Sequence, residues 1–468
     1  MNDPGDGTDR SAAADRIAPS DRSEPMDRSE STDRTAATGV AAITRTHRVI
    51  AAVWRIESAR VIATVARLLN DVGLAEEFAQ DALIAALESW PRDGVPENPG
   101  AWLTTSARRR ALDHLRRQTV AARSHTEIGH ALTDEERHGW LEADAERDLA
   151  IDGTIDDDLL RLIFTACHPV LSREARVALT LRVLGGLTTD EIARAFLIPE
   201  TTLAQRLVRA KRTLAEARVP FELPARDALA DRLDSVLEVI YLIFNEGYSA
   251  TAGDAWFRPA LCDEALRLAR VLAGLMPGES EVLGLQALLE IQASRSAARV
   301  DASGAPILLL EQNRARWDPL LIHRGLTALA RAEAAKVPLG PYALQAAIAA
   351  CHARARQADE TDWPRIVALY DALAEITQSP VVELNRAVAV AIAFGPAAGL
   401  ELVDALVEED SLANYHLLPS VRGDLLYKLG RLPEARIEFE RAASLTRNRR
   451  EQVLLERRAR ECGSRPRA

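Results

Sequence analysis

Apolar residues recur at spacings of three and four along most of this chain, which places them on one face of a helix. Between residues 44 and 118 the pattern runs from Val49 and Val53 to Leu83 and Leu87. It breaks at 96–99 and resumes in a helix expected over 101–118. Alternation with a period of two is nowhere long enough to indicate a sheet. The pattern therefore predicts an all-α protein.

The same pattern divides the chain into five parts. Residues 1–43 are expected to form a disordered tail, because an Asp-Arg pair recurs every six residues and no apolar face exists. A small helical domain follows at 44–118. Residues 119–156 carry ten acidic residues against three arginines with weak periodicity, which favours a flexible acidic linker. Helices resume over 157–220, and residues 225–460 are predicted to be amphipathic helices separated by Gly and Pro.

Residues 187–214 contain the strongest motif, a predicted helix-turn-helix. Thr188 followed by Glu191 is a capping-box pattern, so a helix is expected to begin there. A turn is expected at Leu197–Pro199. The second helix then has one apolar stripe, formed by Leu203, Leu207, Ala210 and Leu214.

The rest of that second helix carries only cationic or hydrogen-bonding candidates for DNA contact. A recognition helix in the major groove needs such groups, because base edges offer hydrogen bonds and phosphates attract cations. A plain amphipathic hairpin with a solvated basic face is the competing interpretation. The candidate residues are Thr201, Thr202, Gln205, Arg206, Arg209, Lys211 and Arg212.

The helix expected over 101–118 is also strongly basic. It has one carboxylate, Asp113, against five arginines, and a cationic helix can follow a phosphate backbone. The arginines are Arg108, Arg109, Arg110, Arg116 and Arg117. Trp90 and Trp102 are expected to pack in the core rather than stack on bases, because each lies among apolar neighbours.

The C-terminal part shows a helical-repeat pattern and no chemistry. Residues 416–447 fit a tetratricopeptide repeat, with small or aromatic packing residues at the expected positions. These positions are Gly423, Gly430, Ala435, Phe439 and Ala442. Gly247 is expected to end a helix, with Asn245 and Tyr248 beside it.

Composition excludes several classes of protein. The net charge of −11 argues against nucleic-acid binding if taken as a sum, but the charge is strongly segregated along the chain. Four scattered cysteines form neither a disulfide framework nor a metal-binding spacing, and no run of apolar residues is long enough to cross a membrane. We expect a cytoplasmic protein without cofactor or metal. We expect no enzyme, because no nucleophile–base pair or phosphate loop is present.

Two stretches of the first helical domain resemble a known family. Residues 71–90 and 98–117 are similar to region two of RNA polymerase sigma factors, and 157–169 with the helix-turn-helix are similar to region four. The order, with no region three between them, is that of the extracytoplasmic-function (ECF) type. Residues 241–248 and 379–387 resemble the long C-terminal extension of one group in that family, described as tetratricopeptide-like.

The resemblance implies a function and two partners, core RNA polymerase and promoter DNA. Region two would grip the −10 element through the basic helix, and region four would bind the −35 element. The C-terminal domain would regulate or support activity, through a regulatory protein or an intramolecular contact. The implied polymerase contacts lie on an acidic helix and are Glu76, Glu77, Gln80, Asp81 and Leu83.

One other class of function stays open at this point. A conventional helix-turn-helix regulator with a helical ligand- or protein-sensing domain would also explain residues 187–214 and 225–460. It would leave 71–117 without a role, so stable binding to core polymerase separates the two interpretations.

Overall fold

The computed structural model describes residues 29–124, 152–196, 198–225, 227–249, 257–301 and 306–464. Every regular element in these ranges is a helix, apart from one isolated bridge between Val300 and Pro306. The predicted all-α class is confirmed.

Three helices form what we call the N-terminal unit: α1 (Ser29–Leu69), α2 (Val72–Asp93) and α3 (Pro99–Ser124). The Asp71 carboxylate caps α2 by accepting from the Leu74 N–H at 3.0 Å. Trp90 is buried and meets Trp102 edge-on at 5.4 Å between ring centroids, which confirms that both tryptophans pack in the core.

The disordered tail was expected to reach residue 43, and this was wrong for 29–43, which α1 includes. The many alanines there favour helix. Residues 1–28 lie outside the described ranges.

Four helices form the middle unit: α5 (Asp152–Ala166), α6 (Arg173–Val183), α7 (Thr189–Phe196) and α8 (Glu200–Glu216). The expected linker 119–156 begins inside α3 and ends inside α5, so it is helical at both ends. Its central part, 125–151, lies outside the described residues.

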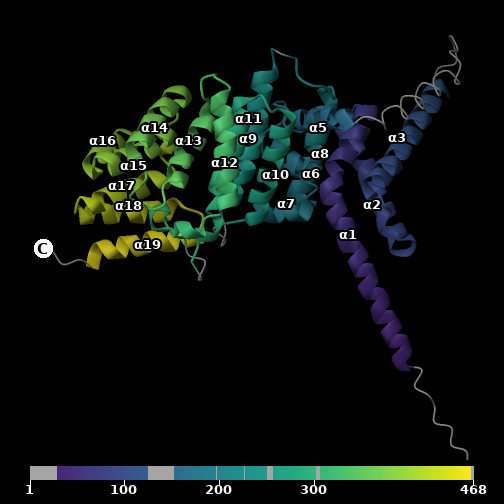
Figure 1. The fold of residues 1–468 in the computed structure, drawn as a ribbon, viewed down its shortest axis with the longest axis horizontal. Helices are drawn as coiled ribbons and strands as arrows, with labels where there is room; N and C mark the ends of the chain where they lie inside the picture. The colour runs from purple at the N-terminus through teal and green to yellow at the C-terminus, as the bar shows by residue number, and fades with distance from the viewer. Residues whose placement is uncertain are drawn as a thin grey trace, which may run out of the picture.

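The C-terminal unit begins with α9 (Leu229–Tyr248), α10 (Pro259–Leu275) and α11 (Ser280–Ser294). It continues with α12 (Pro319–Ala334), α13 (Pro341–Arg354), α14 (Trp363–Thr377), α15 (Pro380–Phe394), α16 (Pro396–Ala405), α17 (Leu417–Lys428), α18 (Leu432–Leu445) and α19 (Arg449–Ser464). Short 3₁₀ turns lie at Ser296–Ala298, Leu309–Glu311, Arg314–Arg316 and Asp410–Leu412. Figure 1 shows these helices stacked side by side, with α1 projecting from the far end of the array.

Sequence neighbours are also neighbours in space within this array, as in α-helical repeat proteins. The repeat predicted at 416–447 packs as expected: Ala435, Phe439 and Ala442 are buried, and a Cβ on Gly423 would lie 3.1 Å from the Phe439 ring. Gly247 was expected to end a helix, and this was wrong. The helix α9 continues to Tyr248, and Gly247 instead lets α10 approach, since a Cβ there would lie 2.7 Å from the Cys262 nitrogen.

One hydrophobic cluster joins all three units, and the C-terminal unit has further clusters of its own. A single buried cluster includes Val65 of α1, Leu181 of α6, Ile240 of α9 and Leu285 of α11. The middle unit therefore lies packed between the other two. Because buried residues are shared between the units, a surface on one unit is held in a fixed position relative to the other two.

Candidate DNA and polymerase interface

The two helices of the predicted helix-turn-helix form as expected. The Thr188 hydroxyl accepts from the Glu191 N–H at 3.1 Å, and the Glu191 carboxylate accepts from the Thr188 N–H at 2.9 Å. Burial raises the pKa of Glu191, but these hydrogen bonds and the nearby Arg55 outweigh it and hold that pKa below its usual value. Pro199 precedes the first turn of α8. The capping box and the start of the second helix are confirmed.

The outer face of α8 is open to solvent along its whole length. The stripe Leu203, Leu207, Ala210 and Leu214 is buried, as predicted. Five of the seven candidate DNA contacts are exposed: Thr201, Thr202, Gln205, Arg209 and Arg212. Arg212 forms an ion pair with Glu216 of the same helix at 2.6 Å.

The other two candidates turn toward the protein. Arg206 is half-buried and acts electrostatically on Glu174 of α6. Lys211 extends to α2, where its ammonium forms an ion pair with the Glu76 carboxylate. The geometry thus divides the seven residues into an exposed group of five and a flanking pair that serves contacts within the chain.

Glu76 is the centre of the contact between the N-terminal and middle units. Only 2% of its surface is exposed, and besides Lys211 it meets Arg182 of α6, whose Nε lies 2.6 Å from Oε1. A buried carboxylate with two cationic partners holds the two units together as long as all three stay paired. In this arrangement Glu76 is inaccessible to a second protein.

Further polar contacts surround this one. Arg55 of α1 lies 2.8 Å from Glu191 of α7, and Arg67 of α1 lies 2.9 Å from the buried Asp158 of α5. The Asn70 side chain accepts from the Phe221 N–H at 2.8 Å. The N-terminal and middle units are therefore closed against one another.

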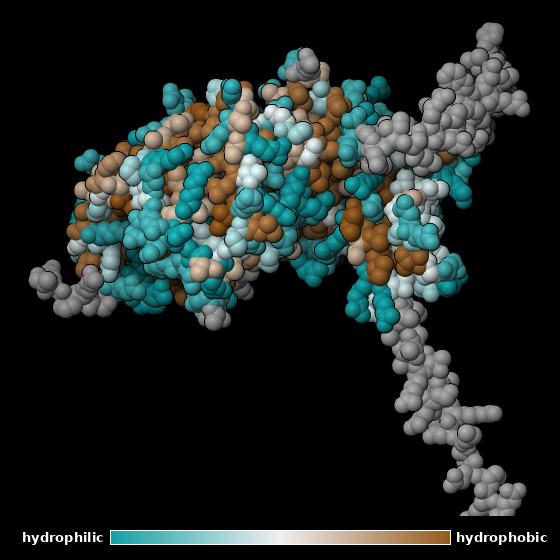
Figure 2. All heavy atoms as spheres, in the orientation of Figure 1, coloured by the Kyte–Doolittle hydropathy of each residue, from teal (hydrophilic) through white to brown (hydrophobic). Residues whose placement is uncertain are grey.

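The other candidate polymerase contacts lie on the outside of α2. Glu77 and Asp81 are exposed, whereas Gln80 and Leu83 are half-buried, with Gln80 donating to Glu76. Sequence reasoning missed Ile84, which is 53% exposed and follows Glu77 and Asp81 on one line of the helix. Figure 2 shows apolar surface gathered over α1 and α2. The outer face of α2 therefore combines two exposed carboxylates, Glu77 and Asp81, with the exposed apolar side chain of Ile84.

The five arginines of α3 also separate into two groups. Arg109, Arg116 and Arg117 are exposed, and Arg116 lies 3.4 Å from Asp113. Arg108 is buried, and the Arg110 guanidinium donates to the Ser106 hydroxyl at 2.6 Å. In this arrangement the three exposed arginines are the ones in position to meet a phosphate backbone.

The C-terminal unit docks directly on the middle unit. The Ser235 hydroxyl of α9 donates to the Cys167 carbonyl at 2.6 Å, and Glu238 lies 3.3 Å from Arg176 and also pairs with Arg173. The Arg258 guanidinium donates to the Ala195 carbonyl at the end of α7. These contacts tie α9 to α6 and to the residue after α5, and they tie the start of α10 to α7.

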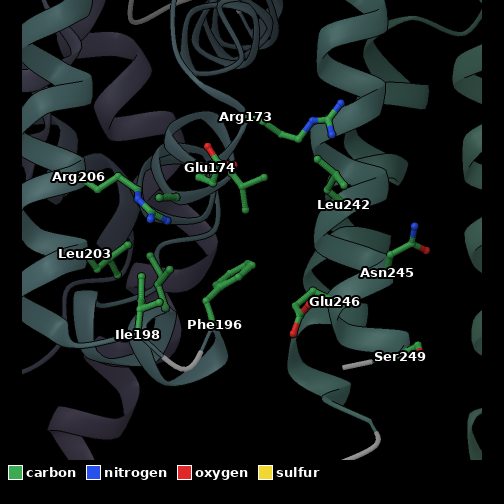
Figure 3. Close-up of a pocket in the computed structure, with 13 residues that line it drawn as sticks. Arg173, Glu174, Phe196, Ile198, Leu203, Arg206, Leu242, Asn245, Glu246 and Ser249 are labelled. Atoms are coloured by element: carbon green, nitrogen blue, oxygen red, sulfur yellow. The ribbon is translucent and has the colours of Figure 1, made fainter. Parts of the chain in front are cut away.

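Between these contacts lies a cavity of about 320 Å³. Figure 3 shows its two walls, with Phe196 of α7 on one side and Leu242 and Glu246 of α9 on the other. Ile192, Ile198 and Leu203 complete the apolar wall below the helix-turn-helix, and Arg206 stands at its edge.

The described residues offer neither a metal-binding cluster nor a membrane-spanning helix. They contain no group of three or more His, Cys, Asp or Glu side chains arranged to hold a metal ion. None of their helices is both long and apolar enough to cross a bilayer. Burial raises the pKa of the Cys167 thiol to about 11, so this cysteine stays protonated near neutral pH.

Comparison with known proteins separates the two interpretations of the helix-turn-helix. The family model for sigma-70 region 2 matches residues 55–120, and that for sigma-70, region 4 matches 161–214. The ECF RNA polymerase sigma factor SigK of Mycobacterium ulcerans (strain Agy99) is 31% identical over 159 residues, which is 33% of this chain and 78% of SigK. The chain belongs to the ECF RNA polymerase sigma factors.

This sigma factor has other relatives and a further matched segment. The probable ECF sigma factor SigI of Mycobacterium tuberculosis (strain ATCC 25618 / H37Rv) is 26% identical over 208 residues, covering 42% of this chain and 68% of SigI. An uncharacterized protein of Rhizobium meliloti (strain 1021), R00370, is 44% identical over 399 residues, covering 85% of this chain and 92% of that protein. Residues 232–333 match a family of unknown function, DUF6596.

The protein is thus a sigma factor that directs transcription initiation, and the sigma factor family is not an enzyme family. A regulator lacking region two would not account for the match over 55–120, so the sigma interpretation replaces it. The N-terminal unit contains region two and the middle unit contains region four.

Proposed function

We propose that the exposed outer face of α8 reads the −35 element and that the exposed arginines of α3 grip the −10 element. Thr201, Thr202 and Gln205 lie in the first turns of α8, where a recognition helix contacts base edges. Arg209 follows and can reach a base edge or a phosphate, and Arg212, one turn further on, can meet a phosphate. The observation that carries this proposal is that the polar face of α8 stays uncovered while its apolar face packs.

Core RNA polymerase is the proposed protein partner, and the outer face of α2 is its proposed docking site. Glu77 and Asp81 supply negative charge, and Ile84 supplies exposed apolar area beside them. Such a mixture is typical of protein interfaces, where charge orients the partner and apolar contact holds it. Glu76, although on the same helix, is proposed to serve the closed arrangement instead.

Binding both promoter elements requires the closed arrangement to open. The elements lie about 25 base pairs apart, on the order of 85 Å at about 3.4 Å per base pair. A unit of about 65 residues has a radius of gyration of roughly 11 Å, so two units in contact cannot reach both elements. The chain from Ser124 to Asp152 allows the separation, since about 28 residues can span roughly 90 Å.

The C-terminal unit is proposed to support activity by holding region four. Its helix α9 contributes to the same core as α6. Ser235, Glu238 and Arg258 connect the C-terminal unit to Cys167, to α6 and to α7. When region four leaves region two, the middle and C-terminal units would move together. Region four would then bind polymerase while the C-terminal unit keeps its helices in place.

Transcription in vitro tests these proposals. The full chain and core enzyme should initiate at promoters mapped after overexpression, and without initiation the DNA and polymerase roles fail.

A chain truncated after Arg226 should lose activity if bracing is required. Because truncation uncovers apolar residues such as Ile192, which faces Leu242 across the cavity, a point variant is needed as well: Glu238→Lys should weaken the docking and lower activity in a folded chain. Full activity of both variants would contradict the bracing role.

A further inference from the structure

One large apolar side chain lies on the face of α8 that is proposed to meet DNA. Val208 is 65% exposed. At about 100° per residue, Thr201, Gln205, Val208 and Arg212 follow one another down a single line of the helix. That line runs opposite the buried stripe of Leu203 and Leu207. Val208 therefore lies at the centre of the outer face.

Exposure alone says little, because single apolar residues are common on protein surfaces. The position of Val208 says more. Valine is β-branched and less favourable in a helix than alanine, and no part of the described chain covers it. Its neighbours on the same line are Gln205 and Arg212, which can both donate hydrogen bonds.

The flanking residues leave Val208 at the front of the helix. Arg206 is directed toward Glu174 on one side of α8, and Lys211 pairs with Glu76 on the other. Neither Arg206 nor Lys211 therefore covers the line of residues on which Val208 lies. A duplex resting on this face would therefore press a base edge against the two methyl groups of Val208.

We propose that Val208 is a specificity-determining residue that contacts the 5-methyl group of a thymine in the −35 element. This inference rests on the proposed role of α8 as the −35 reader. Thymine alone among the four bases carries a methyl group in the major groove. A valine offers no hydrogen bond, so it would favour thymine and disfavour cytosine, whose amino group would lose its hydrogen bond to water.

Deoxyuridine tests the contact, because it pairs like thymine and lacks only the methyl group. Each thymine of the −35 element, on both strands, is replaced singly in a mapped promoter, and holoenzyme binding is measured. The full chain should lose about fourfold in affinity at one position, which is what removing one buried methyl group costs. Val208→Ala should bind the unmodified promoter more weakly and no longer distinguish thymine from deoxyuridine at that position.

Two controls make the result specific. Val208→Thr keeps the shape and one methyl, so it should retain part of the discrimination. Ile437→Ala removes a side chain of similar exposure, 64%, from α18 and should leave the discrimination intact. If Val208→Ala keeps the same sensitivity to deoxyuridine, another residue reads the methyl group and the inference is wrong.

The failure of this inference is distinct from that of the proposed function. Normal initiation by a holoenzyme that tolerates deoxyuridine everywhere would remove Val208 from recognition and leave α8 as the reader. Absence of initiation from any promoter would remove the proposed function itself. A Val208→Ala holoenzyme that binds core polymerase poorly would place Val208 in a protein contact, which also contradicts the inference.

Discussion

Lys211, on the helix proposed to read DNA, forms an ion pair with Glu76, on the helix proposed to meet polymerase. The pair joins the two surfaces of a sigma factor that have to act at separate places on a promoter. Glu76 has almost no exposed surface and is also held by Arg182. Opening the chain must therefore either hydrate this carboxylate or give it new partners.

Glu76→Gln should loosen the closed arrangement. Removing the buried carboxylate leaves the half-buried cations of Arg182 and Lys211 uncompensated, which costs up to about 3 kcal/mol, the lower end of the range for a broken buried pair. We expect the free energy of unfolding, measured with urea, to fall by roughly that amount and the distance between labels on α3 and α18 to become more variable. Glu434→Gln, which removes an exposed pair with Arg431, is the control and should change neither quantity. Unchanged stability of Glu76→Gln would show that the pair contributes little to closure.

Stability should fall as the pH is lowered from about 6.5 toward 4. Burial, with Arg295 and Arg314 nearby, lowers the pKa of His352 to about 4, whereas the unfolded chain keeps a value near 6.5. Between these values the unfolded state binds a proton that the folded state does not, so the free energy of unfolding decreases with falling pH. The full difference for His352 is at most about 3 kcal/mol.

His352→Gln should flatten this dependence. Thermal unfolding at pH 7 and pH 5 measures it, and the variant should lose less stability between the two than the parent. Burial also lowers the pKa of His168 to about 4, but that residue is more exposed and should contribute less. His168→Gln therefore serves as the comparison. If it flattens the curve more than His352→Gln does, the assignment to His352 is wrong.

The helix-turn-helix could be predicted because its determinants are local. The Thr188–Glu191 capping box and the apolar stripe of α8 depend on spacings of three and four, which the sequence displays directly. The roles of Glu76 and Lys211 could not be predicted in this way. They lie far apart in the chain, and only the packing of α2 against α8 turns two surface charges into a buried pair.

Two other features could not be predicted for the same reason. A glycine near a helix end usually marks a cap, but Gly247 serves the approach of α10, which is a contact with a different helix. The α3 arginines looked equivalent in sequence, yet Arg108 is buried and Arg110 bonds to Ser106. Periodicity finds the faces of a helix, whereas which face meets a neighbour depends on the tertiary fold.

Charge reversal on the outer face of α2 should reduce binding to core polymerase. Glu77→Lys with Asp81→Lys removes two exposed negative charges, which should mainly slow association and weaken it further at low salt. Pull-down of core enzyme measures the loss, and binding of the chain to promoter DNA alone should not weaken. Glu401→Lys with Glu408→Lys, two exposed positions in the C-terminal unit, gives the matched change in net charge. Equal pull-down by both double variants and the parent would remove α2 from the interface.

Arg209 and Arg212 should differ in what they contribute to promoter binding. Arg209 is exposed and forms no ion pair among the described residues, whereas Arg212 pairs with Glu216. Arg209→Ala should cost about 1–3 kcal/mol if the side chain contacts a base, and the loss should be confined to one promoter position. Arg212→Ala should weaken binding to all sequences alike and reduce the salt slope by about 1, because a phosphate contact releases counterions.

Glu216→Gln frees Arg212 from its partner and should strengthen binding at low salt. Titrations at several salt concentrations, with matched and mismatched −35 elements, separate these outcomes. Normal binding and transcription by both alanine variants would show that the outer face of α8 is not the DNA-reading surface.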